Sequence, residues 1–163
     1  ITSVWIFGNV DMFEKIDIKG GQMTYAQRIE LGQIFASGKP ESHIFREMFA
    51  CLAPDHEVLF SAEEIEYYNE VMEGLLYWIN RETKELQYKP TADELAAGIR
   101  EFSRLVSDMG TITSLAEKFS KDPDEILQWK YGKVYNILYT NKESYLYSRR
   151  YNDVIMQKSK IRK

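Results

Sequence analysis

The stretch DPDEILQWKYGKVYNILY, residues 122–139, decides the fold that the sequence predicts. Asp122 is a helix-capping residue, Pro123 suits the first helical position, and two acidic residues follow in the first turn. The helix expected from Ile126 to about Tyr139 is apolar on nearly every side, which is typical of a helix at the centre of a core or shared with a partner. Its main stripe holds Leu127, Tyr131, Val134 and Leu138, widened by Trp129, Tyr135 and Tyr139.

Working outward, the starts of other helices are marked by Ser or Thr three residues before Glu or Gln. In such a capping box the hydroxyl accepts a backbone N–H and the third side chain reaches back to the cap. The pattern occurs at Thr24…Gln27, Ser61…Glu64 and Thr91…Glu94, and Pro40 precedes a further helix. These signals predict helices along most of the chain after residue 22.

The limits and faces of these helices are predicted from spacing. We expect Gly110 to close the helix that starts after Thr91, residues 81–89 to be a linker, and a last helix to begin near Asn141 or Lys142. The helix after Ser61 carries an apolar stripe expected to face the core: Ile65, Tyr68, Met72, Leu75, Leu76 and Ile79. Its acidic residues are interpreted as a solvated face: Glu63, Glu64, Glu66, Glu70 and Glu73.

The N-terminal residues have a different pattern. Residues 4–7 and 13–18 are typical of two short strands, the second because apolar and charged residues alternate, and Gly20-Gly21 ends it. The predicted fold class is therefore mainly α, a single helical domain of about six helices with a short N-terminal β element. Its parts are a β-prone segment 1–22, a helical domain 23–157 and a basic, frayed tail 158–163.

Charge is divided unevenly along the chain. Residues 1–128 hold 12 basic and 23 acidic side chains, a net charge of −11, whereas residues 129–163 hold 9 basic and 2 acidic ones, a net charge of +7. Such a division is typical of a basic tail that meets an anionic partner. The other interpretation is that the tail docks on the acidic body of the same or a neighbouring chain, and a homo-oligomer is left open.

The chemistry of a catalytic or metal site is largely missing from the sequence. There is no phosphate-binding glycine loop and no nucleophile elbow, and the two histidines, His43 and His56, fit no metal-ligand spacing. The single cysteine, Cys51, lies among apolar residues and is expected to be a small core residue. We therefore expect a non-enzymatic protein with no cofactor, no metal and no membrane span.

A helix-turn-helix is the alternative from another functional class. Residues 111–138 have the outline of a short helix, a tight turn and a capped second helix, and the basic C-terminal region would contact phosphates. A recognition helix needs polar and basic side chains at its exposed start. Here that start is Pro123-Asp124-Glu125, which would repel phosphate, so nucleic-acid binding is the less favoured interpretation.

The stretch SLAEKFSKDPDEILQWKYGKVYNILYTNKESYLYSRRYNDVI, residues 114–155, resembles the tail assembly chaperones of tailed bacteriophages and prophages, which are small, acidic and helical. The resemblance covers about a third of the chain well. It implies a chaperone, in the cytoplasm of a bacterial host cell, that holds the helical tape-measure protein during tail assembly. The residues that match the family pattern are Leu115, Ala116, Pro123, Ile126, Leu127 and Trp129.

The expected function is accordingly to bind a helical protein partner in an assembly process. Residues 123–155 are where aromatic side chains gather and the charge changes sign. Tyrosine and tryptophan combine apolar rings with a polar tip, which suits interfaces. The residues predicted to contact the partner are Trp129, Tyr131, Tyr135, Tyr139, Arg149 and Arg150.

Overall fold

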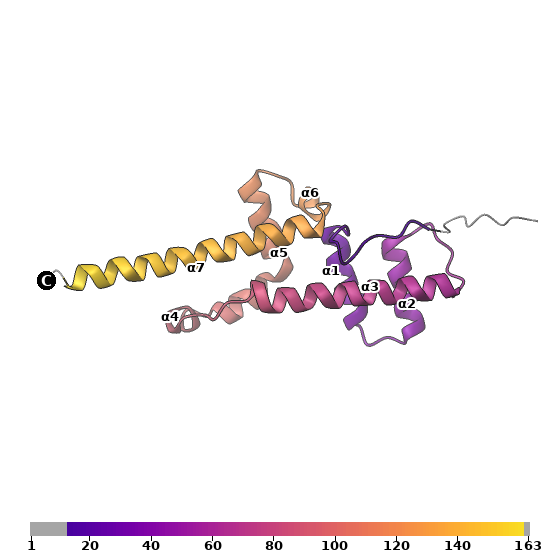
Figure 1. The fold of residues 1–163 in the computed structure, drawn as a ribbon, viewed down its shortest axis with the longest axis horizontal. Helices are drawn as coiled ribbons and strands as arrows, with labels where there is room; N and C mark the ends of the chain where they lie inside the picture. Colours follow the sequence, from indigo (N-terminus) through magenta and orange to yellow (C-terminus); the bar gives the residue numbers. More distant parts are fainter. Residues whose placement is uncertain (1–12, 162–163) are drawn as a thin grey trace, which may run out of the picture.

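A computed structural model describes residues 13–161 of the chain (Figure 1). Of these residues 74% are helical, in one domain, which confirms the predicted mainly α class. The described residues form seven α-helices, one more than the six or so expected, and one π-helix. In chain order they are α1 (Tyr25–Ala36), α2 (Glu41–Leu52), α3 (Ala62–Arg81), η1 (Glu82–Leu86), α4 (Ala92–Ala96), α5 (Ile99–Phe119), α6 (Pro123–Leu127) and α7 (Tyr131–Ile161).

The helix starts predicted from capping patterns are confirmed. Thr24, Ser61 and Thr91 each cap a helix with a complete capping box, in which the hydroxyl accepts the backbone N–H three residues on. Asp122 caps α6 by accepting from the N–H of Asp124, with Pro123 in the first turn. Helix initiation in this chain is therefore encoded locally.

The predicted N-terminal β element is wrong where the structure describes it, because no strand occurs in residues 13–161. Residues 13–18 lie against α3, and their backbone groups bond to its side chains instead of to a neighbouring strand. The N–H of Ile16 donates to the hydroxyl of Tyr67 at 2.9 Å, and the indole of Trp78 donates to the carbonyl of Ile18 at 2.7 Å. The other expected strand, residues 4–7, lies outside the described residues.

The prediction of which α3 residues face the core is also wrong in part. Of that stripe Ile65, Leu76 and Ile79 are exposed, while Tyr68 and Leu75 are buried. The face that packs inward lies about one residue away around the helix, and it includes one of the glutamates expected in solvent. Its buried residues are Glu64, Tyr67, Tyr68, Val71, Gly74, Leu75 and Trp78.

Two interior boundaries differ from the expectation as well. The predicted linker 81–89 begins instead as the π-helix η1, which continues α3 as far as Leu86. The helix that starts after Thr91 does not reach Gly110, because α4 ends at Ala96 and Gly98 is left-handed. A separate helix, α5, runs through Gly110 to Phe119 after a kink at Ser107 (φ 42°, ψ −141°). The kink turns the second half of α5 toward α6, so that Ile112 and Leu115 reach the core.

The helix expected from Ile126 to Tyr139 is divided, and the break expected near residue 141 does not occur. α6 ends after five residues, whereas α7 runs unbroken for 31 residues from Tyr131. Backbone bonds explain the division: the N–H of Tyr25 donates to Trp129 O at 2.9 Å, and the N–H of Tyr131 donates to Met23 O at 2.8 Å. The chain between α6 and α7 is thus tied to the start of α1 instead of continuing as helix.

In Figure 1, α3 and α7 run in roughly the same direction, with α7 extending well past the end of α3. The core lies at the other end, where α1, α2 and the N-terminal segment pack with α3, the second half of α5 and the first turns of α7. There the indole of Trp78 packs edge-on against both Tyr131 and Tyr135, with ring centroids 5.1 and 5.0 Å apart. The second half of α7 extends beyond this core.

Candidate functional site

Three tyrosines of α7 are bound by three glutamates of the segment that follows α3. Tyr131 donates its hydroxyl to Glu82, Tyr135 to Glu85 and Tyr145 to Glu94. The tyrosines share one face of α7, because Tyr135 and Tyr145 follow Tyr131 by 4 and 14 residues, which are close to whole turns of the helix. We call this set of three pairs the tyrosine–glutamate ladder.

Basic side chains complete each rung of the ladder. Arg28 binds Glu82 through two atoms, at 2.9 and 2.7 Å, and the Arg81 Nη2 atom lies 2.9 Å from Glu85. Lys142 of α7 also donates to the backbone carbonyl of Glu85 at 2.8 Å. The Arg149 Nη1 atom lies 3.8 Å from the third glutamate, Glu94.

These contacts favour the ionised form of Glu85 and Glu94 and the neutral form of the tyrosines. Hydrogen bonds from Arg81 and Tyr135 lower the pKa of Glu85, and the hydroxyl of Tyr145 lowers the pKa of Glu94. Burial, together with the bond to Glu85, raises the pKa of Tyr135 to about 12. The ladder therefore sets the direction of α7 relative to the body over the whole neutral pH range.

The part of α7 beyond the ladder is exposed all round. Every residue from Arg150 to Ile161 is exposed, on every side of the helix. Isolated helices of this length are marginal in water, because most helix stability in proteins comes from packing of an apolar face. Residues 150–161 thus form a helix that packs against no other element in the described part of the chain.

An apolar stripe with coiled-coil spacing begins at Tyr147 and continues along that exposed segment to Ile161. Successive members of the stripe are 4, 3, 4 and 3 residues apart, which places them along one side of α7. This side is opposite the face that carries the tyrosines of the ladder. Tyr147 and Ile161, at its two ends, are 61% and 84% exposed. Beside the stripe lies Arg150. We call Tyr147, Tyr151, Val154, Lys158 and Ile161 the α7 stripe.

A second exposed stripe with the same spacing lies on α3. Leu76, its fourth member, is 54% exposed, and it follows Ile65, Asn69 and half-buried Met72 along the outer side of the helix. Glu66 and Glu73 lie beside this stripe, with two further glutamates one row away. We call Ile65, Asn69, Met72, Leu76 and Ile79 the α3 stripe.

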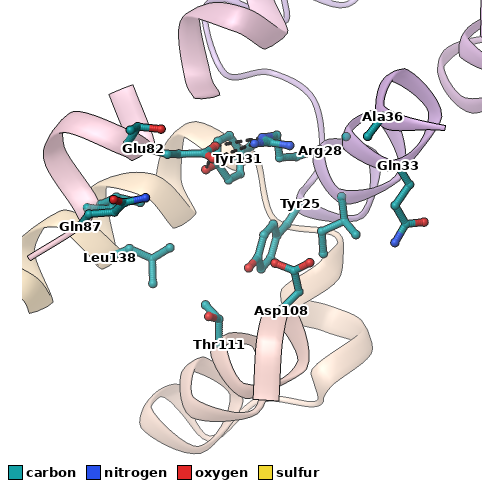
Figure 2. A pocket seen from close by; sticks show the side chains of 14 residues that line it. Tyr25, Arg28, Gln33, Ala36, Glu82, Gln87, Asp108, Thr111, Tyr131 and Leu138 are labelled. Carbon is teal, nitrogen blue, oxygen red and sulfur yellow. Dashed lines mark hydrogen bonds and ion pairs between the residues drawn. The ribbon is translucent and has the colours of Figure 1, made fainter. Parts of the chain in front are cut away.

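A polar cleft of about 540 Å³ lies between α1, η1, the second half of α5 and the start of α7 (Figure 2). Arg28 and Glu82 on its wall bind each other, so their charges are mutually neutralised. Across the cleft, burial and the nearby Asp108 raise the pKa of Tyr25 to about 12, which keeps its hydroxyl protonated at neutral pH. The cleft walls thus hold a closed ion pair, neutral phenols and the carboxylate of Asp108.

The six predicted contact residues are distributed over quite different environments. Tyr131 and Tyr135 are only 3% and 1% exposed, so their rings are not available to a partner. Trp129 is half-buried beneath the ammonium group of Lys133, which lies 3.5 Å from the ring centroid. The remaining three lie on the part of α7 nearer the solvent: Tyr139 is exposed, Arg149 faces Glu94, and Arg150 borders the α7 stripe.

The helix-turn-helix interpretation meets a geometric obstacle. The expected recognition helix ends after five residues, Pro123–Leu127, and Ile126 is fully buried. A helix of this length is too short to carry base-reading side chains along a major groove. Within residues 13–161 there is also no group of three metal-ligating side chains, and none of the helices in that range is long and apolar enough to cross a membrane.

Comparisons of the chain with protein-family models, with curated proteins and with solved structures find no match.

Sequence reasoning missed the glutamates of the ladder and the exposure of the α3 stripe. A usable signal was present: tyrosines at 131, 135 and 145 mark one face of a helix, and apolar residues at 147, 151, 154 and 161 mark the opposite face. An apolar face that shifts by half a turn within one helix indicates a change from a packed to an unpacked segment.

Proposed function

We propose that this chain is a non-enzymatic assembly protein that binds helical protein segments through the α7 stripe. The observation that carries the proposal is the exposed second half of α7, which has coiled-coil spacing and is held out from the body by the ladder. A helix that lays an apolar row against another helix is a common mode of protein recognition. The proposed ligand is therefore an amphipathic helix.

Charge narrows the class of helix that would bind. Residues 147–163 hold six basic side chains and one acidic one, a net charge of +5. Electrostatic complementarity across an interface favours partners of opposite charge and rejects those of like charge. The preferred partner is thus an amphipathic helix flanked by glutamate or aspartate.

The resemblance to tail assembly chaperones adds a finer proposal. In that setting the bound helix would belong to a tape-measure protein, and the acidic body, with a net charge of −11 over residues 1–128, would keep the complex soluble. Co-expression tests this point: a tape-measure protein that is soluble with the intact chain should aggregate with a stripe variant.

A peptide-binding experiment tests the general proposal. The probes are two synthetic amphipathic helices with the same leucine stripe, one flanked by glutamates and one by lysines, with binding followed by fluorescence anisotropy. We expect the acidic peptide to bind at least tenfold more tightly. The double variant Tyr151→Glu/Val154→Glu should abolish binding, because it places charge in the apolar row.

The matched control has the same charge change on the same helix. Asn152 and Ser159 are exposed residues of α7 outside the stripe, so the double variant Asn152→Glu/Ser159→Glu should keep most of the affinity. Equal binding of both peptides, or equal loss in both variants, would contradict the proposal. Binding of double-stranded DNA that weakens steeply with salt, without peptide binding, would instead favour the nucleic-acid interpretation.

A further inference from the structure

We infer that the helix recognised by the α7 stripe is the α3 helix of a second copy of this chain. The inference rests on the proposed function and names its partner. It goes beyond that proposal because both surfaces lie on the same chain, which makes the protein self-associating.

The α3 stripe and the α7 stripe have the same residue spacing. The α3 stripe occupies positions 65, 69, 72, 76 and 79, and the α7 stripe occupies 147, 151, 154, 158 and 161. Both have the intervals 4, 3, 4 and 3, and both span 14 residues, about 21 Å at 1.5 Å per residue. Two helices with this repeat can pack along their full common length by knobs-into-holes packing.

The helices that carry the two stripes have opposite net charges. Residues 62–81 hold five acidic side chains and one basic one, a net charge of −4, whereas residues 147–163 have a net charge of +5. Glu66 and Glu73 border the α3 stripe, while Arg150 borders the α7 stripe and Lys158 lies within it. Residues beside the apolar row of paired helices set partner choice through such charges.

Lysine side chains of the N-terminal segment already reach part of the acidic face of α3. Lys15 lies 3.8 Å from Glu63, and Lys19 lies 3.3 Å from Glu73, both in exposed pairs. Exposed pairs of this kind contribute little to stability. Glu66 and Glu70 make no ion pair with any other described residue, so at least these two carboxylates remain for a basic partner helix.

The α7 stripe cannot reach the α3 stripe of its own chain. The ladder binds residues 131–145 to η1 and α4, which follow α3, and α7 continues straight past the end of α3 (Figure 1). Its residues 147–161 therefore lie beyond the helix whose stripe they match. A second copy supplies that helix without any change in the fold of either copy.

The two stripes are mostly apolar, so contact between them would bury apolar side chains as well as pair opposite charges. Each stripe has four apolar members, with Asn69 as the polar residue of the α3 stripe and Lys158 as that of the α7 stripe. A single polar residue in an otherwise apolar row lowers affinity but fixes the register and choice of partner. Contact between the stripes would cover the large exposed apolar side chains Leu76, Tyr147 and Ile161.

The test is a charge exchange between two variants of the full chain, followed by sedimentation equilibrium. The intact chain should exceed its monomer mass of 19.2 kDa at micromolar concentration. The α7 variant, Arg150→Glu/Lys158→Glu, and the α3 variant, Glu66→Lys/Glu73→Lys, should each be monomeric, because like charges then face each other. An equimolar mixture of the two should associate again, since the exchanged charges are complementary.

Matched controls carry the same charge changes at exposed positions away from both stripes. These are Lys89→Glu/Lys130→Glu and Glu57→Lys/Glu117→Lys, which should associate like the intact chain. A circular dichroism spectrum like that of the intact chain excludes unfolding as the cause of any loss.

The outcomes separate this inference from the proposed function. A chain that is monomeric at every concentration but still binds the acidic peptide through α7 would overturn the inference and leave the proposed function standing. A chain that associates while both charge variants remain associated would also overturn it. Loss of peptide binding together with a monomeric mass would overturn both.

Discussion

The hydroxyl of Tyr131, the first residue of α7, lies 2.5 Å from a carboxylate oxygen of Glu82, the first residue of η1. This bond joins the helix that carries the proposed binding surface to the end of α3, 49 residues earlier in the chain. It is also the first rung of the ladder, so the direction of α7 depends on it.

Tyr131→Phe should lower the free energy of unfolding by about 1.5–3 kcal/mol, the usual range for a hydrogen bond to a charged group. The ring stays buried, so the loss reports the bond and not a cavity. Urea denaturation followed by circular dichroism measures it. Tyr139→Phe is the control, because the Tyr139 hydroxyl makes no hydrogen bond to a described residue; an equal loss there would contradict the assignment.

Amide hydrogen exchange should divide α7 at the end of the ladder. In dilute solution we expect residues 150–161 to exchange rapidly, because these residues are exposed on every side, and residues 131–145 to be protected. At concentrations where the chain self-associates, protection should extend to residues 147–161 and increase along α3. Strong protection of residues 150–161 in the dilute monomer would show that they are packed within one copy.

Stability should fall in acid because of Glu64. Burial by itself would raise the pKa of this carboxyl, but the N–H groups of Leu59 and Ser61 and the ring of His56 bond to it and lower the pKa below 4.5. A lowered pKa in the folded state favours the ionised form, so its stabilisation is present above pH 4.5 and is lost as the pH falls through the folded-state value.

Glu64→Gln tests that contribution by removing the charge while keeping the shape. The variant should be less stable at pH 7 by about 1–3 kcal/mol, as expected when a buried hydrogen-bonded charge is lost. Its unfolding free energy should also fall less than that of the intact chain as the pH drops below 4.5. Parallel slopes for both proteins over this range would contradict the assignment.

The stability of the folded state should also fall at high pH, because of buried tyrosines. The pKa of Tyr135 is raised from 10.0 to about 12, and that of Tyr25 likewise, so the folded state favours the protonated phenols. Their contribution is complete below pH 10 and is lost as the pH rises toward 12. Tyrosinate absorbance should therefore show a late-titrating fraction, which should be smaller in Tyr135→Phe. In about 8 M urea, which unfolds the chain, the hydroxyls of all tyrosines should titrate near pH 10.

Two glycines test how closely the N-terminal segment approaches α7. Gly21 and Gly38 both have positive φ, 75° and 68°, so alanine is strained at either position. At Gly21 a Cβ would also lie 2.8 Å from the Cα atom of Gly132, whereas at Gly38 nothing lies within 4 Å. Gly38→Ala should cost about 1 kcal/mol. Gly21→Ala should cost about 1–3 kcal/mol more because backbone must move, and equal costs in thermal denaturation would contradict this.

The sequence predicted the features of this protein that depend on neighbouring residues. Thr24, Ser61, Thr91 and Asp122 begin helices because a cap needs only a hydroxyl or carboxylate and the backbone N–H groups of the next turn. The mainly α class followed from those starts and from apolar spacing. The charge division likewise located the basic half of α7.

Which surfaces are buried was decided by the tertiary structure. α3 has apolar residues on two adjacent faces, and the inner face was selected by Trp78 and Tyr67, which bond the distant N-terminal segment. Glu64 is buried because loop residues 56–61 fold back over it. The break before Tyr131 depends on backbone bonds to residues about 100 positions earlier. Spacing alone cannot distinguish an apolar stripe that packs inward from one that remains exposed, because that choice depends on residues distant in the sequence.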